Sequence, residues 1–587
     1  MPAPGVTVDP TTPSLHAVHV ADADWRFEYS GTCEPTGIAL RRGLFDLGGS
    51  DDGRQVVHHR LACTLEPGAD HEIQVDATAA DGSRHRAVLE FSSAADPAPT
   101  GVEVRAAAAF SRRSVDRLFD QYVREAVLQE VDTPIVGTLV ALLVAEIAER
   151  TWTELGGRAA WGTRSAAVSY ASRSPSGAAA TLSGLVAEPD VRGASDYVRP
   201  DRIVVLAHAT GSTPSRLRPN DGTVVLANLL AGRGYLVVAP DNWGRGHGDG
   251  ADEPETYLMA NRVAANGLDM VRAVLDDARY AAFHDAPDPV EAALVGYSQG
   301  GHSAVALWLA GASLADDIAV REVYAGGGPH DLYRSFRGVL EHVADRCDGN
   351  PWCREVDPGV MLPYAVGRIL PALLRYTDVG LTPDDALDGE RLSEAFVTGM
   401  LDGDERFDAL KTMLQLNSFS NIADLAATLP DTDARILLYH SPFDRLLPQR
   451  NTADLAEALF PGFDVTANLE ACSSRTFEEL GDLVDMAGVV HTICAFEVFD
   501  RVLRDLRDSE AARTGYDRIV ARRLDPAAPW RDLAERRAGI ALDDVSGLAA
   551  FRAEKSPAEL RALSRRLRTA DSPALRELAD RVWREPR

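Results

Sequence analysis

Short apolar runs alternate with longer amphipathic segments through the middle of the chain. Eight runs rich in Val, Ile, Leu and Ala are typical of strands, and they lie at 166–171, 178–186, 203–207, 234–241, 292–295, 320–325, 435–440 and 464–469. Helical patterns separate several of them, at 223–231, 257–276 and 303–310. Continuous apolar strands are buried on both faces, as in parallel sheets. The alternation therefore predicts an α/β fold with a doubly wound, mostly parallel sheet.

The N-terminal part has a different pattern. Residues 1–14 are rich in Pro and Thr and are expected to form a disordered N-terminus. Residues 15–98 hold short strand-like runs broken by turns, which predicts a small all-β sandwich. The segments 65–68, 71–75, 81–82 and 87–91 resemble the second half of a fibronectin type III domain, with Trp25 in the place of its core tryptophan. This resemblance implies a role in spacing or binding.

Three further regions complete the expected domain organisation. Residues 99–165 are predicted to be a linker followed by a helical segment that packs on the next domain. Residues 166–500 would form the α/β domain. Its segment at about 329–430 is too long for a simple connection and is predicted to be an inserted helical cap. Residues 501–587 are predicted to be a charged helical C-terminal extension.

The turn between the run at 292–295 and the following helix carries the strongest chemical signal. It reads Gly296-Tyr297-Ser298-Gln299-Gly300, a Gly-x-Ser-x-Gly nucleophile elbow in strand-turn-helix context. Glycines at both sides let the strand and the helix approach closely. The alternative is a glycine-rich turn of an ordinary α/β domain. We predict that Ser298 is a nucleophile.

A serine nucleophile needs a base, and the base is usually a histidine oriented by a carboxylate. In this type of fold the acid and then the base follow the serine along the chain. Asp444 lies in the loop that leaves the run at 435–440, where the triad acid is expected, although it also fits an ordinary turn aspartate. His491 is the only histidine after Asp444 and is the predicted base. His302, one helical turn after Ser298, is expected to support the site.

The oxyanion of the reaction needs two N–H donors. Gln299, directly after the nucleophile, is predicted to supply the first. The loop after the run at 203–207 is placed to supply the second, and we choose Thr210 over Ala209. The Thr210 hydroxyl is a further potential donor.

Residues 165–500 resemble the secretory lipase family of α/β-hydrolases, of the fungal lipase A type. The matching motifs are 208–212, 234–241, 268–273, 296–301 and 325–329. The resemblance implies hydrolysis of carboxylic esters, no cofactor, no metal and a helical cap between the sixth and seventh strands. Ala209 departs from the pattern, because glycine is commoner there. The first 98 residues and the charged tail lie outside the resemblance.

Charge and cysteines bear on partners and location. The chain has 587 residues, with 60 Lys and Arg against 88 Asp and Glu, a formal charge of −28. Such acidity argues against nucleic acid and anionic membranes as partners, and no apolar stretch reaches the length of a membrane span. The six cysteines form three sequence-local pairs, which suggest the disulfides Cys33–Cys63, Cys347–Cys353 and Cys472–Cys494. Paired cysteines favour a secreted protein, with a cytoplasmic one as the alternative, since the N-terminus has no signal peptide.

The sequence thus predicts a serine-dependent esterase or lipase that acts on a small-molecule or lipid-like ester, with its oligomeric state left open. Three alternatives remain. A prolyl-oligopeptidase-like serine peptidase uses the same triad, although about 80 residues are too few for a β-propeller. A polyester depolymerase would share the chemistry. A binding protein with a disused hydrolase core is the third. The apolar runs 360–366 and 369–374 of the cap are expected to line an acyl pocket or to pack the core of the cap.

Overall fold

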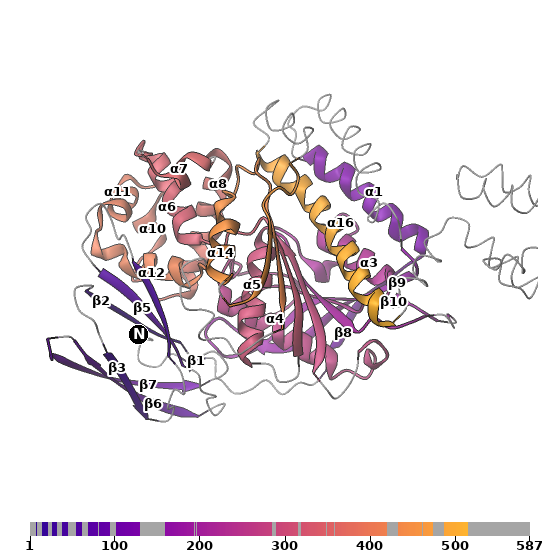
Figure 1. Cartoon of the computed structure of the whole chain (residues 1–587), viewed down its shortest axis with the longest axis horizontal. Helices are drawn as coiled ribbons and strands as arrows, with labels where there is room; N and C mark the ends of the chain where they lie inside the picture. Colours follow the sequence, from indigo (N-terminus) through magenta and orange to yellow (C-terminus); the bar gives the residue numbers. More distant parts are fainter. Residues whose placement is uncertain are drawn as a thin grey trace, which may run out of the picture.

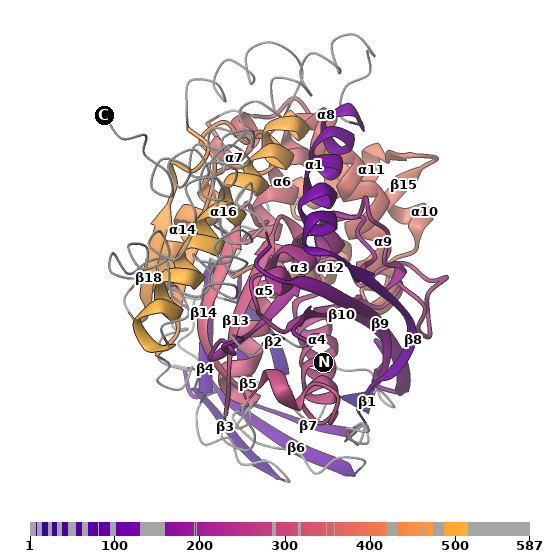
Figure 2. The ribbon, with the colours of Figure 1, turned by 90° about the vertical axis from the view of Figure 1, so that its right-hand side faces the viewer.

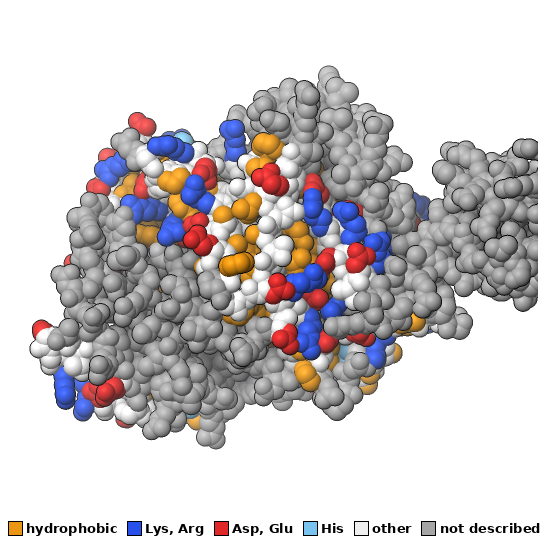
Figure 3. Space-filling view, in the orientation of Figure 1, with side chains coloured by type: hydrophobic (Ala, Val, Ile, Leu, Met, Phe, Trp, Pro, Cys, Tyr) orange, Lys and Arg blue, Asp and Glu red, His pale blue; other side chains and the backbone are white. Residues whose placement is uncertain are grey.

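A computed structural model describes most of the chain (Figure 1). Before residue 62 the structure describes five strands, at 7–8, 14–20, 26–31, 38–44 and 54–61. It then describes residues 69–79, 81–93, 101–129, 159–192, 194, 197–284, 289–314, 318–347, 349–356, 358–419, 433–460, 462–473 and 487–514. Figure 3 shows acidic and basic side chains interspersed over the described part of one face. No described helix is both long and apolar enough to cross a membrane.

The first 93 residues contain two small sheets. One has the order β1-β7-β6-β3 and the other β2-β5-β4, with every pair antiparallel except β1 and β7. The strands are β1 (Thr7–Val8), β2 (Ser14–Val20), β3 (Arg26–Gly31), β4 (Ile38–Leu44), β5 (Arg54–Leu61), β6 (Asp70–Thr78) and β7 (Arg84–Ser93). The predicted all-β region is confirmed. Its fibronectin type III identity stays a prediction, and Trp25, Cys33 and Cys63 lie outside the described residues.

A nine-stranded sheet forms the centre of the molecule, in the order β18-β17-β14-β13-β11-β12-β10-β9-β8. Its strands are β8 (Glu103–Phe110), β9 (Gly162–Arg173), β10 (Ala179–Asp190), β11 (Arg202–Ala207), β12 (Val237–Pro240), β13 (Val290–Tyr297), β14 (Ile318–Gly326), β17 (Arg435–Tyr439) and β18 (Asp464–Asn468). The six neighbouring strands β18, β17, β14, β13, β11 and β12 pair in parallel. The other pairs, β12 with β10, β10 with β9 and β9 with β8, are antiparallel. This confirms the predicted α/β fold with a mostly parallel sheet.

Helices cover both faces of this sheet (Figure 2). On one face, α1 (Arg112–Gln129), α3 (Gly222–Gly232) and α16 (Ala487–Thr514) pack with Val204 and Leu206 of β11. On the other, α4 (Ala260–Leu275), α5 (Gln299–Leu314) and α14 (Arg450–Leu459) pack with Ile203 and Val205. Successive strand residues point to opposite faces. The continuous apolar runs therefore contribute to two cores at once, one on each face of the sheet.

The insertion between β14 and β17 is helical and has a core of its own. Its elements are α6 (Leu332–Val343), α7 (Pro351–Glu355), α8 (Pro358–Tyr364), the π-helix η3 (Ala365–Ile369), α9 (Leu370–Tyr376), α10 (Pro383–Ala386), the hairpin β15 (Leu387–Asp388) and β16 (Arg391–Leu392), α11 (Glu394–Asp402), η4 (Glu405–Phe407) and α12 (Asp408–Leu416). The predicted helical cap is confirmed over these residues. Residues 420–432 lie outside the described part.

Two boundaries differ from the prediction. We expected a linker and a helix over 99–165, but Glu103–Phe110 is a strand that pairs with β9 and extends the central sheet, before the helix α1. We also expected a boundary at 500, whereas α16 runs unbroken from Ala487 to Thr514. Helix α16 packs on the sheet through Val502 and Leu506, so its burial carries it past the expected boundary.

Candidate active site

Ser298 lies on the turn between β13 and α5, in a left-handed backbone conformation with φ of +58°. Its N–H donates to the Gly326 carbonyl at 2.8 Å, which ties the turn to the neighbouring strand β14. A Cβ at Gly296 would collide with the Gly300 carbonyl, and one at Gly300 with the Ala207 carbonyl. The left-handed backbone of Ser298 is strained, and such strain persists only where the surrounding structure enforces it, as at functional turns. The elbow thus leaves Ser298 half-buried at the carboxyl edge of the sheet.

Asp444 follows β17 in a loop that closes around its carboxylate. The N–H groups of Leu446 and Leu447 donate to Oδ1 at 3.0 and 3.1 Å. Burial alone would raise the pKa of Asp444, but its interaction with His491, the hydrogen bond included, outweighs burial and lowers that pKa. Asp444 is therefore an ionised carboxylate with no exposed oxygen.

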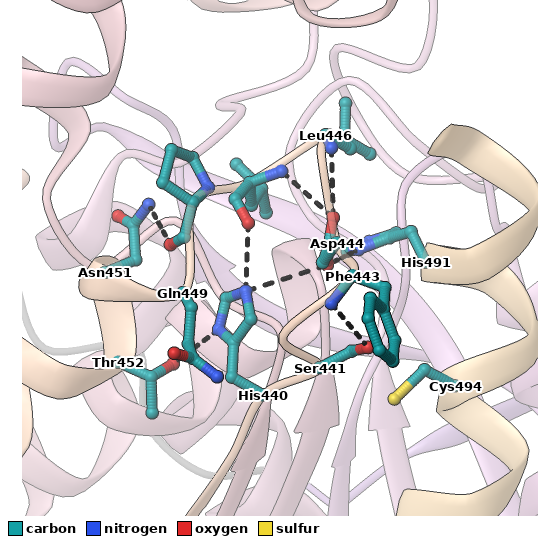
Figure 4. A network of polar contacts seen from close by, with 12 residues as sticks. His440, Ser441, Phe443, Asp444, Leu446, Gln449, Asn451, Thr452, His491 and Cys494 are labelled. Carbon is teal, nitrogen blue, oxygen red and sulfur yellow. Dashed lines mark hydrogen bonds and ion pairs between the residues drawn. The ribbon is translucent and has the colours of Figure 1, made fainter. Parts of the chain in front are cut away.

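His491 points at this carboxylate (Figure 4). Its Nδ1–H donates to Asp444 Oδ2 at 2.6 Å. Its Nε2 is buried and has no hydrogen-bond partner among the described residues, Ser298 included. The ring lies 5.0 Å from that of Tyr297, the residue before the nucleophile, and 3.3 Å from the position of a Cβ on Gly327. His491 lies near the start of α16, whose packing on the sheet fixes the imidazole.

A second histidine, His440, also lies near Asp444, 3.7 Å from Oδ2 (Figure 4). Its Nε2–H donates to the Leu447 carbonyl at 2.9 Å, and its Nδ1 accepts from the Thr452 hydroxyl at 2.7 Å. Burial lowers the pKa of His440. Both ring nitrogens are occupied, so His440 is a neutral support for the loop of Asp444.

Two of the three predicted disulfides are present. Cys472 and Cys494 are bridged, with Cα atoms 5.6 Å apart, and Cys494 lies one helical turn after His491. Ser441 Oγ donates to the Cys472 carbonyl at 3.4 Å, which connects the bridge to the loop of Asp444. Cys347 and Cys353 are bridged in the cap.

The two predicted oxyanion donors lie in the elbow itself and in the loop after β11. Gln299 is the first residue of α5, and its buried side chain donates to Glu255. The Thr210 hydroxyl lies 2.9 Å from the Tyr257 hydroxyl, while Ala209 is exposed. The preference for Thr210 over Ala209 stays a prediction.

His302 lies beneath the elbow. It is fully buried, with Nε2 donating to the Asn417 carbonyl at 2.8 Å and its ring 4.5 Å from that of Phe419. Burial lowers the pKa of His302 to about 4. The imidazole is neutral and links α5 to the end of the cap.

Two residues of the site were not predicted, His440 and Glu255. Glu255 has no local sequence signal, because its contacts with Gln299 and Arg368 join segments far apart in the chain. His440 contacts Asp444, Leu447 and Thr452 nearby in the chain, and its place at the end of the run before Asp444 was the available signal. Among the described residues, His342, Cys347 and Cys353 are the one set of closely spaced metal-ligand side chains. The disulfide removes both thiolates, which are the forms that bind metal.

Comparisons with known proteins found remote likenesses. No family model and no curated protein matches the chain. A putative hydrolase from Legionella pneumophila is 18% identical, with a TM-score of 0.46 over 70% of this chain and 98% of that one. The rice cell wall degrading esterase LipA from Xanthomonas oryzae is 17% identical, with a TM-score of 0.45 over 70% and 100%. Candida antarctica lipase A is 16% identical, with a TM-score of 0.34 over 52% and 71%. These likenesses do not assign a function to this chain.

Proposed function

We propose that the chain is a serine-dependent carboxylic-ester hydrolase. The observation that carries the proposal is the buried hydrogen bond between His491 and Asp444, next to the elbow that presents Ser298. An elbow alone fits many α/β domains. A charged carboxylate that holds a histidine beside the elbow is the arrangement that activates a serine hydroxyl.

The hydrogen bonds define the tautomer of His491. Because a carboxylate only accepts hydrogen bonds, the proton shared with Asp444 sits on Nδ1. In the neutral ring Nε2 then carries a lone pair, and this nitrogen has no partner within the described structure. It is therefore the atom available to receive a proton. In a ligand-free enzyme the hydrogen bond from base to nucleophile is often loose and tightens when substrate binds.

The reaction follows from these positions. Ser298 Oγ attacks the ester carbonyl carbon while its proton moves to His491 Nε2, and the carbonyl oxygen becomes an oxyanion held by Gln299 and Thr210. Collapse breaks the bond to the alcohol, which leaves with the proton from His491. A water then gives its proton to His491 and attacks the acyl-enzyme. The acid is released and the Ser298 hydroxyl is restored.

The two disulfides support a further proposal about location. Structural disulfides persist in oxidising compartments and are rare in the cytosol. The bridges Cys347–Cys353 and Cys472–Cys494 fit a protein that works outside the cell.

A substrate panel with a matched pair of variants tests the proposed function. The panel holds p-nitrophenyl esters of increasing acyl length and aminoacyl-nitroanilides. We expect ester hydrolysis by the wild type and its loss by about 10⁴-fold or more in Ser298→Ala. Ser303→Ala is the control, since Ser303 lies on the same helix but is buried and donates to the Gln299 carbonyl at 3.0 Å. Cleavage of anilides but not esters would instead identify a peptidase, and a folded Ser298→Ala variant with full activity would exclude this serine.

A further inference from the structure

Glu255 is a carboxylate buried beside the elbow, in the loop between β12 and α4. Two side chains of the same loop bind it: Arg245 Nε donates to Oε2 at 2.8 Å, and Asn242 Nδ2 donates to Oε1 at 3.1 Å. Burial alone would raise the pKa of Glu255, but His208, Arg245 and the hydrogen bonds lower it. A full charge is therefore held next to the reaction centre, and the proposed mechanism gives it no chemical step.

The first contact that Glu255 makes outside its loop is with the elbow. Gln299 Nε2 donates to Glu255 Oε1, and the Gln299 side chain is almost completely buried. Gln299 is the residue whose backbone N–H is the first proposed oxyanion donor. Anchoring its side chain holds the first turn of α5, and with it the direction of that N–H.

The second contact is with the loop that carries the other donor. His208 Nε2 lies 3.8 Å from Glu255 Oε1, and His208 Nδ1–H donates to the Ala209 carbonyl at 3.0 Å. That carbonyl and the Thr210 N–H belong to one planar trans peptide and point in opposite directions. His208 therefore sets the direction of the Thr210 N–H. Two residues after Glu255, the Tyr257 hydroxyl also contacts the Thr210 hydroxyl at 2.9 Å.

The third contact comes from the cap. Arg368, in the π-helix η3, places a guanidinium nitrogen 3.7 Å from Glu255 Oε2. The same guanidinium lies 5.8 Å from the centre of the Tyr257 ring. Single π-helical turns inside helices occur frequently at functional sites. The cap thus touches the segment that orders both donors.

We propose that Glu255 is a positioning residue of the oxyanion hole, which aligns Gln299 and the Thr210 loop and is itself held by Arg368 of the cap. This inference rests on the proposed ester hydrolysis. A charge at this point also explains the choice of residue, since hydrogen bonds to a carboxylate are about twice as strong as those between neutral groups. A purely structural Glu255 would affect folding and leave the binding of the transition state unchanged in the folded enzyme.

The test compares Glu255→Ala, Glu255→Gln and Arg368→Gln with Glu188→Gln. Glu188 is the matched control, because it is also a buried carboxylate paired with an arginine, Arg164. It lies on β10 beside the first residue of β12, at the edge of the sheet opposite the elbow. Each variant is assayed for kcat and KM on p-nitrophenyl butyrate and for binding of an alkylboronic acid, whose serine adduct is a tetrahedral anion. Thermal unfolding reports folding.

We expect Glu255→Ala to lower kcat by about 10²-fold and to weaken boronic acid binding by a similar factor, with KM changed less than about threefold. Glu255→Gln keeps the shape without the charge and should lose about tenfold in both. Arg368→Gln, at a half-exposed site, should shift both in the same direction by a smaller factor. Glu188→Gln should change neither kcat nor boronic acid binding.

Three results would overturn the inference. One is a folded Glu255→Ala with unchanged kcat and boronic acid binding. The second applies if Glu255→Ala does not fold: kcat and boronic acid binding that are unchanged in both Glu255→Gln and Arg368→Gln. The third is a loss in Glu188→Gln equal to that in the Glu255 variants. A wild type that neither hydrolyses esters nor binds the boronic acid contradicts the proposed function itself, and is thereby distinguished from a failure of Glu255 alone.

Discussion

The Asp444 carboxylate lies beside two imidazoles, His440 and His491, which differ in their hydrogen bonds. His440 has both nitrogens bound, to Thr452 and to the Leu447 carbonyl. His491 has only Nδ1 bound, and its Nε2 is left without a partner among the described residues. A general base needs an unoccupied lone pair near the proton that it takes. The hydrogen bonds therefore support the proposal that His491, and not His440, is the base.

Asp444→Asn tests how the base is oriented. The amide can pair with His491 only by stabilising the other tautomer or by a weaker bond, so we expect kcat to fall by about 10⁴-fold with a small change in KM. Asp433→Asn is the control, since Asp433 is exposed at the opposite end of the same strand and pairs with Arg321 at 3.7 Å. An Asp444→Asn variant with kcat close to that of the wild type would show that Asp444 does not orient the base.

His302 predicts how stability depends on pH. Its pKa is about 4 in the folded protein against 6.5 ordinarily, so between these values the unfolded chain binds a proton that the folded protein does not. This stability is complete above pH 6.5 and is lost as the pH falls toward 4. The loss reaches about 3 kcal/mol, at about 1.4 kcal/mol per unit of pKa.

The measurement is urea unfolding at several pH values for the wild type and His302→Gln. The free energy of unfolding should fall more steeply with decreasing pH in the wild type than in the variant. His247→Gln, at an exposed position, should behave like the wild type. Parallel pH curves for the wild type and His302→Gln would contradict the buried neutral state of His302.

At the scale of elements, the apolar residues of the cap fall into two groups, those buried in its core and those only partly buried against it. Ile369 and Leu373 are almost fully buried in the core of the cap, whereas Leu362 is only partly buried against it. A larger side chain inside a packed core typically costs about 1–3 kcal/mol. Ile369 and Leu373 thus hold the cap together, and Leu362 is the remaining candidate for contact with an acyl chain.

Leu362→Phe should therefore change the substrate preference. We expect the ratio of kcat/KM for long-chain to short-chain esters to shift severalfold, at about 0.8 kcal/mol for each methylene that gains or loses a buried position. Ile369→Val is the control and should lower the unfolding temperature without moving this ratio. An unchanged ratio in Leu362→Phe, with turnover retained, would leave the apolar runs of the cap as core alone.

The elements that the sequence did not predict have physical reasons. Glu103–Phe110 is mostly exposed at the edge of the sheet, and its run of four alanines favours a helix more than a strand. The start of α16 reads Gly488-Val489-Val490 and disfavours a helix locally. Its packing on the sheet through Val490 and Ile493 overrides that preference. The inner strands were predictable because burial on both faces demands apolar residues at most positions.

At the scale of the whole molecule, the candidate site joins segments that lie between residues 208 and 491. The order of Ser298, Asp444 and His491 along the chain predicted these three residues, and the structure joins Asp444 and His491 by a hydrogen bond, with His491 beside Tyr297 of the elbow. Glu255 was not predictable in this way. It lies in an acidic loop, and its contacts with Gln299 and Arg368 exist only after the cap and the sheet have come together.

The described strands before residue 94 contribute no residue to the candidate site. Deletion of residues 1–98 should therefore leave kcat/KM for a small soluble ester within about twofold of the wild type. The cut spares β8, which covers the edge of β9. Deletion of residues 1–111 removes β8 as well and should promote aggregation by exposing that edge. A folded 99–587 fragment without activity would show that the N-terminal β-sheet region, residues 1–98, shapes the site.

The covalent step at Ser298 is the central claim, and mass spectrometry of the trapped enzyme tests it directly. The protein is incubated with an alkyl fluorophosphonate, which replaces the serine proton and releases fluoride. We expect one added phosphonyl group per chain, mapped by peptide fragmentation to Ser298, with labelling lost in Ser298→Ala and retained in Ser303→Ala. Labelling at another residue, or equal labelling of Ser298→Ala, would contradict the account.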